Sequence, residues 1–371
     1  MGRSPLFFRL VCAAFFAVAA ARAQAQSVAQ DLQNFVTYSD TYNLITFGNT
    51  TLGGSSDTQG GIAVGGNLSL GGSWTIASQV SADPNPSLYV AGQLTLNGTS
   101  MQNNGYASLP GLNPNDWTWN SSQKELTGSD GTLEMNSSDS RASTNPIDNP
   151  IPSGWNWTTE QNEYDSISTS LARASTNGTI SVSGGNLDFN TTVTSGVAVF
   201  DLDAADLSGN SYNGNSFSNI QISVPTGVDH VINVTNLASG QTLFGSGANF
   251  NSGSNDNQLL WNFEGPSEGT GSVTISDGGN FYGSVLAPKV SITDDTTVDG
   301  QVVADSFDDC GVELHDSDFS DVLVPEPSAF AIGVLALCAA AVVPAVISRR
   351  RAAARAQARA ALVPLANSVS K

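Results

Sequence analysis

Two stretches of the chain, "VGGNLSL" at residues 64–70 and "VAGQLTL" at residues 90–96, repeat one pattern position by position. In both, a small pair containing glycine is followed by apolar residues that alternate with polar ones. Alternation with a period of two predicts a strand with one buried face. The small pair predicts a corner where backbones come close together. The repeat therefore predicts short strands that meet at corners.

The same form recurs near the other end of the acidic body. "LAPKVSI" occupies residues 286–292, and "VADSF" at 303–307 repeats its beginning. Recurrence at such intervals predicts the stacked coils of a β-solenoid, with an apolar ladder inside and Ser, Thr, Asn and Asp outside. A β-sandwich would show similar alternation. The recurring corners favour the solenoid, because the dipeptides of hairpin turns do not dominate.

Helical periodicity is found in two places. Residues 158–174 predict a helix capped by Thr158 or Thr159 and ending near Ala174. Its apolar stripe consists of Tyr164, Ile167 and Leu171. A lone amphipathic helix needs an apolar partner, so we expect it to pack on the flank of the solenoid. A second, weaker helical pattern lies near residues 28–38.

The charge of the chain is unevenly distributed. Every Asp and Glu, 33 in all, lies between Asp31 and Glu326, and only four basic residues share this stretch, which leaves it a formal charge of −29. Such a body repels phosphate backbones and excludes nucleic acid as a partner. Charged residues are few, however, while Gly, Ser, Thr and Asn are many. This composition favours strands and turns over disorder.

The segment 1–25 has the pattern of a secretory signal peptide. Arg3 and Arg9 precede a short apolar run, and small-x-small cleavage patterns lie at residues 21–25. Export of the body is therefore expected. Of the three cysteines only Cys310 lies in the body, so no disulfide is expected within it.

The other end has three parts. Residues 321–328 form a linker, residues 329–348 carry no charge, and residues 349–371 form a basic tail. Twenty apolar residues span roughly 30 Å as a helix, which is the thickness of a bilayer core. The positive cluster directly after them consists of Arg349, Arg350 and Arg351. This order predicts a transmembrane helix with a cytoplasmic tail.

The linker ends in the motif "VPEPS", made of Val324, Pro325, Glu326, Pro327 and Ser328. Its prolines keep the backbone extended and out of a helix. Motif, apolar span and arginine cluster together resemble the PEP-CTERM sorting signal of Gram-negative bacteria. The resemblance implies processing by an exosortase, an integral membrane cysteine protease of organisms that make exopolysaccharide. The tail departs from the pattern, since a long segment follows the arginines.

The body has a family resemblance of its own. Residues 42–70 resemble the opening of the choice-of-anchor A domain, residues 259–307 resemble its closing segment, and "ELHDSDF" at 313–319 resembles its finish, with His315 in the matching place. The resemblance implies an ice-binding-like adhesive domain at 28–320, a right-handed β-solenoid with one packed helix. Residues 99–155 are interpreted as an insertion. The family supplies no catalytic residues to transfer.

Candidate catalytic groups are few. His230 and His315 lie far apart in the sequence, and Cys310 stands among carboxylates that would raise its pKa. Asp201 and Asp203 would share one strand face, as in a polysaccharide-active enzyme. The body has too few basic residues to support that chemistry well. The interpretation is therefore a protein without enzymatic activity.

Two further kinds of site come from composition. Residues 293–300 and 305–321 are rich in oxygen ligands and make calcium binding possible, although neither matches a known calcium loop. No other cofactor is indicated. "WTW" at 117–119 and "WNW" at 155–157 can stack on sugar rings. They can equally pin the insertion and the helix start to the solenoid.

These observations favour an exported, non-enzymatic adhesive or structural protein of the cell envelope or exopolysaccharide matrix. Before processing, a C-terminal anchor would hold it in the inner membrane. A rigid face rich in Thr, Ser and Asn would bind a polysaccharide or surface ligand. One alternative is a polysaccharide-active β-helix enzyme. Another is an ice-binding module, which would need a regular threonine ladder where the sequence shows only scattered elements.

Overall fold

The computed structural model describes residues 28–319, apart from 38, 40, 81–84, 223–224, 226, 245–248, 253–255, 266–270, 277–278 and 318. The chain divides into two units, Met1–Val324 and Pro325–Lys371, and every described residue belongs to the first. The signal peptide, the "VPEPS" motif, the apolar span and the arginine cluster lie outside the described residues. Within the described part, no helix is long and apolar enough to cross a membrane.

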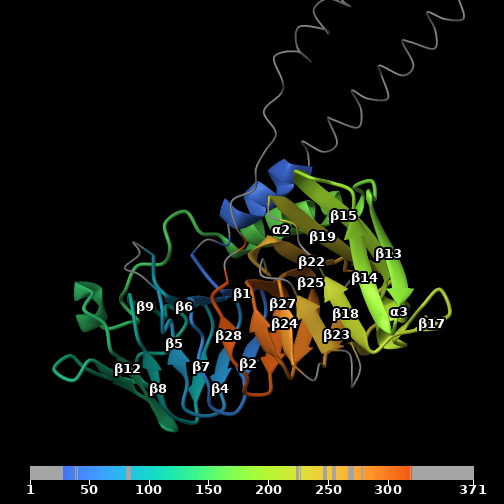
Figure 1. Cartoon of the computed structure of the whole chain (residues 1–371). Coiled ribbons are helices and arrows are strands. Elements are labelled where there is room, and N and C mark those ends of the chain that lie inside the picture. Colours follow the sequence, from blue (N-terminus) through green and yellow to red (C-terminus); the bar gives the residue numbers. More distant parts are fainter. Residues whose placement is uncertain are drawn as a thin grey trace, which may run out of the picture. The chain divides into compact units, whose positions relative to one another are not determined.

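Parallel strands build the first unit (Figure 1). The main sheet runs β15 (Gly196–Asp203), β19 (Val228–Thr235), β22 (Leu259–Phe263), β25 (Ser284–Asp294), β27 (Val302–Asp309), β1 (Leu44–Thr46), β3 (Ile62–Val64), β6 (Leu88–Val90), β9 (Ala107–Ser108). Every pairing on this path is parallel. Parallel neighbours one coil apart in sequence define a β-solenoid. The sandwich alternative is therefore wrong.

Two further faces complete the coils. The second carries β20 (Gln241–Leu243), β23 (Gly271–Ile275), the later parts of β25 and β27, β2 (Thr50–Leu52), β4 (Leu68–Leu70) and β7 (Leu94–Leu96). The third carries β24 (Asn280–Tyr282), β26 (Thr297–Asp299), β28 (Leu314–His315), β5 (Thr75–Ile76), β8 (Gly98–Gln102) and β12 (Gly131–Met135).

Further elements belong to the same unit. The strands are β10 (Thr118–Asn120), β11 (Glu125–Thr127), β13 (Gly178–Ser183), β14 (Asn186–Thr191), β16 (Ser211–Tyr212), β17 (Asn215–Ser216), β18 (Asn219–Ile222) and β21 (Asn249–Ser252). The short helices are η1 (Ser140–Ser143), α3 (Ala204–Ser208) and η2 (Asp256–Gln258). Antiparallel pairs such as β10–β11 and β13–β14 depart from the parallel pattern.

The repeated motifs set the pairing that they predicted. Val64 lies opposite Val90 where β3 meets β6. Leu68 and Leu70 of β4 lie opposite Leu94 and Leu96 of β7. The second pair of motifs, at 286–292 and 303–307, sets the pairing between the first parts of β25 and β27. There, Leu286 lies opposite Val303. An irregularity between Ala287 and Ser291 then shortens the spacing between partners, so that Ser291 lies opposite Ser306.

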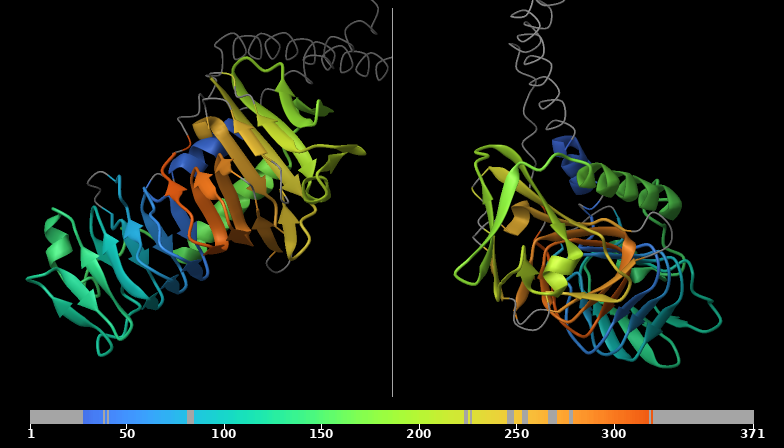
Figure 2. Two further views of the ribbon diagram at one scale, coloured as in Figure 1. Left: turned by 60° about the horizontal axis from the view of Figure 1, so that its bottom comes forward. Right: turned by 90° about the vertical axis from the view of Figure 1, so that its right-hand side faces the viewer.

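The coils do not stack in sequence order, because β1 pairs with β3 on one side and with β27 on the other. From β1 the chain stacks outward to β9. It then passes through α2 (Trp157–Ala172), re-enters at β15 and stacks back to β27. The helix packs on β19, β22 and β25. One end of the stack is thus joined to the other by the helix (Figure 2).

Alternating side chains feed two hydrophobic cores. Leu44, Ile62 and Leu88 point into the solenoid, whereas their neighbours Ile45 and Ala63 pack under the helices. The second core also contains Tyr164, Ile167 and Leu171 of α2, which confirms the predicted stripe. Residues 28–37 form the second predicted helix and bury Leu32 and Phe35 there. Both helices lie on the same side of the coils (Figure 2, right).

The predicted cap of α2 is wrong by two or three residues. The N-cap is Asn156, whose side chain accepts a hydrogen bond of 3.0 Å from the backbone N–H of Thr159. Asn is among the preferred N-cap residues. Trp157 can then begin the helix with its indole stacked on Tyr89, the ring centroids 5.3 Å apart. The helix ends at Ala172, shortly before the predicted end.

The segment interpreted as an insertion begins as another coil. Met101 of β8 lies opposite Thr75 of β5, at the same spacing that pairs Leu68 with Leu94, and β9 continues the main sheet beside β6. Only from β10 onward does the segment leave the repeat. There, β10 and β11 add antiparallel strands beside β12, which pairs with β8.

Candidate functional site

The second face of the solenoid carries one aligned column of outward side chains. Its members, in register from rung to rung, are Thr242, Thr274, Thr293, Asp308, Thr51, Ser69 and Thr95. Six of these seven side chains are hydroxyls. We call this the hydroxyl face, meaning the face of β20, β23, β2, β4, β7 and the later parts of β25 and β27. The threonines that the sequence shows as scattered elements are therefore aligned in one row, which Asp308 and Ser69 interrupt.

Most rungs hold the column residue outward by burying the residues on either side of it. In β4, Leu68 and Leu70 are fully buried and Ser69 lies between them. In β7, Leu94 and Leu96 flank the exposed Thr95 in the same way. Parallel strands lie about 4.8 Å apart. The column is therefore a periodic row of hydroxyls on a backbone that is anchored from inside.

A second polar row borders the column. Ser272, Ser291 and Ser306 lie in register, and the hydroxyl of Ser306 donates to that of Ser291 at 2.8 Å. Further along the stack, amide side chains act as backbone acceptors. Asn49 Oδ1 accepts from the N–H of Asn67 at 2.9 Å, and Asn67 Oδ1 accepts from the N–H of Gln93 at 2.8 Å. These bonds fix the corner of the face from one coil to the next.

Carboxylates interrupt the middle of the face. Asp308 is exposed in the column, while Asp294 and Asp309 lie buried directly beneath it. Burial raises the pKa of Asp309 to about 6, and burial together with the charge of Asp309 raises the pKa of Asp294 well above its ordinary value. Burial and the neighbouring carboxylates also raise the pKa of the exposed thiol of Cys310, as predicted. This thiol is a poor nucleophile.

Comparison with known proteins identifies the domain. A family model described as "Putative Ice-binding-like adhesive domain" matches residues 36–316. The chain belongs to this family. No curated protein matches the chain.

Solved structures similar to this adhesive domain include three ice-binding proteins. A glycosylated one from an Arctic yeast is 12% identical, covers 79% of this chain and 95% of its own, and has a TM-score of 0.32. An ice-binding protein domain from Shewanella frigidimarina is 13% identical, covers 76% and 96%, and also has a TM-score of 0.32. One from the Antarctic ascomycete Antarctomyces psychrotrophicus is 12% identical, covers 77% and 97%, and has a TM-score of 0.24.

The predicted carboxylate pair of the adhesive domain is engaged in structural bonds. Asp201 and Asp203 both lie on β15, as expected. Asp201 accepts hydrogen bonds from Asn233 at 3.0 Å and from Thr176. Asp203 is the N-cap of α3, accepting at 2.8 Å from the N–H of Ala205. Each carboxylate thus ties backbone segments together, and the geometry gives no support to paired acid–base chemistry.

The two histidines of the adhesive domain have different surroundings. His230 is buried and stacks on Phe200, with ring centroids 5.5 Å apart, and burial lowers its pKa. His315 lies between two carboxylates: Nδ1 contacts Asp299, and Nε2 lies 2.8 Å from Glu313. Burial lowers the pKa of His315, but the bonds to Glu313 and Asp299 outweigh it and raise the pKa overall. Both histidines are thus held within the fold, one by stacking and one by bonds to carboxylates.

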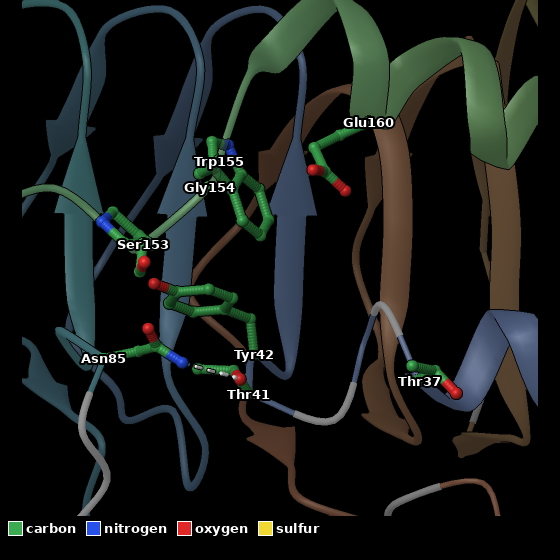
Figure 3. A pocket seen from close by; sticks show the side chains of 9 residues that line it. Thr37, Thr41, Tyr42, Asn85, Ser153, Gly154, Trp155 and Glu160 are labelled. Atoms are coloured by element: carbon green, nitrogen blue, oxygen red, sulfur yellow. Dashed lines mark hydrogen bonds between the residues drawn. The ribbon is translucent and has the colours of Figure 1, made fainter.

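The prediction that the tryptophan motifs pin their segments to the solenoid is confirmed in part. Trp155 and Trp157 pack with Tyr42 and Tyr89 where α2 begins. A cavity of about 180 Å³ lies there, with Tyr42 and Trp155 facing one another (Figure 3). It is smaller than the roughly 300 Å³ at which ligand pockets begin. Trp117 and Trp119 are also partly buried and pack against the solenoid core.

The described residues contain no group of three or more His, Cys, Asp or Glu side chains placed to hold a metal ion. Acidic residues of 293–300 and 305–317 are instead distributed between the interior and the surface. Asp309, for example, accepts at 2.7 and 3.0 Å from the N–H groups of Gly311 and Val312. Calcium binding there stays a prediction.

Proposed function

We propose that this protein is an exported adhesive module of the cell envelope or exopolysaccharide matrix, and that it binds through the hydroxyl face. The observation that carries the proposal is the column of six hydroxyls and one carboxylate on seven aligned rungs. Family membership supports the adhesive role. The solenoid supplies rigidity, since every rung has at least one buried apolar residue next to its column residue.

A hydroxyl is both a donor and an acceptor. A row of them can therefore bond to a polyhydroxylated partner without a fixed pattern of donors and acceptors. Each contact is weak in water, because it replaces a bond to solvent. Repetition along the stack converts weak contacts into avidity. This favours an extended, repetitive ligand such as a polysaccharide.

Ice is the second candidate ligand, and the same periodic column favours it. The carboxylate of Asp308 opposes it, because a charged group holds its own hydration shell in place of lattice-ordered water. Asp295, also exposed, follows the Thr293 rung and adds to this effect. We therefore prefer a polysaccharide over ice as the ligand of the wild-type protein.

A polysaccharide-active enzyme finds no support in the described site residues. The bonds of Asp201 and Asp203 are accounted for by the fold. His315 bonds to Asp299 and Glu313, and Asp299 also accepts from Asn280, so these side chains are likewise bonded to one another within the fold.

Export and sorting belong to the same proposal and rest on sequence alone. The signal peptide would direct the body outward, and an exosortase would process the chain at the Pro-Glu-Pro motif. A double substitution, Pro325→Ala with Pro327→Ala, should leave a larger, membrane-bound form in fractionated cells of the producing organism. The wild-type body should be shorter and outside the inner membrane. Full-length protein in the cytosol would contradict this part of the proposal.

The choice between ligands is tested by two adsorption measurements on one protein. Depletion from solution is measured over immobilised matrix polysaccharide and over growing polycrystalline ice, for the wild type and for Asp308→Thr. We expect the wild type to adsorb to polysaccharide and to be rejected by ice. Ice incorporation by the wild type would favour the second candidate, and Asp308→Thr should then increase it.

A further inference from the structure

A groove of about 380 Å³ opens at the β7 edge of the hydroxyl face. Its wall on the face is β7, including Thr95, together with Gln93 just before it. The opposite wall is the segment before β10 and the turn before β12. Its remaining polar and aromatic members are Asp116, Trp117, Ser129 and Asp130. The volume lies within the roughly 300–1,000 Å³ range of ligand pockets. All of these residues are described.

The groove has a fixed aromatic wall. Trp117 is partly buried and packs against the solenoid core. A side chain at Gly128 would meet the indole, since a Cβ there would lie 2.9 Å from its ring. Glycine therefore lets the indole lie directly on the turn, which limits its freedom. An indole face is an apolar platform on which the C–H face of a pyranose ring can stack.

The two carboxylates of the groove are also held in place. Asn113 Nδ2 donates to Asp116 Oδ2 at 2.9 Å, and Ser129 Oγ donates to Asp130 Oδ2 at 2.9 Å. Both carboxylates are exposed. An ionised carboxylate only accepts hydrogen bonds, and it can accept from more than one donor. Sugar hydroxyls are suitable donors, and bonds to a charged acceptor are stronger than neutral ones.

The negative charge of the groove narrows the class of sugar that it can bind. The residues that line the groove include two carboxylates and no Lys, Arg or His. The whole body carries a formal charge of −29. A uronic acid or sulfated sugar would meet repulsion at close range. A neutral sugar would not.

We infer that this groove is a binding subsite for a neutral hexopyranose unit of a glycan, stacked on Trp117 and hydrogen-bonded by Asp116 and Asp130. Thr95 belongs both to the groove and to the hydroxyl column. A glycan seated in the groove can therefore continue along the face. The inference rests on the proposed function to this extent, because it names the ligand class of the same face.

The test is titration of the full-length protein with soluble trisaccharides of neutral hexoses, followed by calorimetry. We expect saturable binding that Trp117→Ala weakens by about tenfold, the size of a stacking contact. Trp117→Phe should restore part of the affinity. Asp130→Asn should weaken binding with little effect on folding, since the exposed side chain bonds only to Ser129 among the described residues. Asp188→Asn, on β14, is the matched control.

Three results with sugars would overturn the inference. These are no saturable binding of any neutral trisaccharide, unchanged affinity in both Trp117→Ala and Asp130→Asn, or tighter binding of a uronic acid trisaccharide. Loss of binding with a chelator would also overturn it, because direct bonds to the carboxylates need no metal. If soluble sugars do not bind while the protein still adsorbs to matrix polysaccharide, the groove is excluded as a sugar-binding subsite. The proposed adhesive role of the hydroxyl face is then retained.

Discussion

Asp294 and Asp309 lie opposite each other on adjacent rungs inside the solenoid. The other members of this interior column are apolar, namely Leu243, Ile275, Leu52, Leu70 and Leu96. One oxygen of each carboxylate, Oδ2, is buried without a hydrogen-bond partner among the described residues. An ionised pair in this position is costly, so the fold favours a protonated form.

This pair makes stability depend on pH. The folded pKa of Asp309 is raised to about 6, above an unfolded value of about 3.8. A raised carboxyl pKa means that its stabilising effect is full below about pH 4 and is lost as pH rises through the folded pKa. The free energy of unfolding should therefore fall between about pH 4 and pH 7. Denaturant unfolding at a series of pH values measures it.

Asp309→Asn should remove the part of this dependence that Asp309 contributes, while buried Asp294 keeps its own part. The amide oxygen can still accept from Gly311 and Val312, and its NH₂ group can donate to Asp294. At pH 7.5 the variant should be more stable than the wild type by up to roughly 3 kcal/mol, and near pH 4 by little. Asp308→Asn, an exposed change on the same strand, is the control. If Asp309→Asn and Asp308→Asn lost the same amount of stability on raising the pH, this would contradict the assignment of the pH dependence to Asp309.

His315 and His230 should titrate at clearly different pH values. The carboxylates of Glu313 and Asp299 raise the pKa of His315, whereas burial lowers that of His230. The chain has only two histidines. Proton NMR of their ring signals should thus show one transition above pH 6.5 and one below it. Two coincident transitions would be inconsistent with the carboxylate pairing of His315.

The same pairing has a consequence for stability. A histidine with a raised folded pKa contributes stability that is complete below its unfolded pKa and is lost as pH rises through the folded one. His315→Gln should therefore cost about 1 kcal/mol at pH 6 and less at pH 9, the pair being partly exposed. Thermal unfolding at both pH values checks this difference.

Asn156 should account for the stability of the helix start. Asn156→Ala removes the bond to the N–H of Thr159 and should cost about 1 kcal/mol of unfolding free energy. Thr158→Ala, at an exposed residue inside the first turn, should cost much less. A larger loss in the Thr158 variant would show that the cap is assigned to the wrong residue.

Repeats within the sequence predicted the local pairing of the solenoid but not its order. The alignment of Leu68 with Leu94 can be read directly from the letters, since both are apolar positions of the same motif. The pairing of β1 with β27 joins residues such as Leu44 and Val302, which no repeat connects. It depends on the helix that carries the chain from one end of the stack to the other.

Because the order of the coils was not predictable, the hydroxyl column could not be predicted from the sequence either. Its members come from two separate blocks of sequence, and only the β27–β2 pairing puts Asp308 beside Thr51. The sequence signal for a column residue was a local triplet in which a Ser or Thr lies between two apolar residues. Examples are "LSL" at 68–70 and "LTL" at 94–96. The runs of Asp at 293–300 and 305–321 were interpreted as candidate calcium ligands. Strand alternation instead places Asp309 inside and Asp308 outside.

The hydroxyl face is tested most directly by crowding it. Thr51→Tyr with Thr293→Tyr places two large side chains on the column, one on either side of Asp308, without changing any buried residue. Thr179→Tyr, at an exposed position of β13, is the matched control. The quantity measured is the protein retained on immobilised matrix polysaccharide at fixed concentration. We expect the double variant to lose at least about tenfold in affinity while the control matches the wild type. Retention of the double variant at the wild-type level would contradict it.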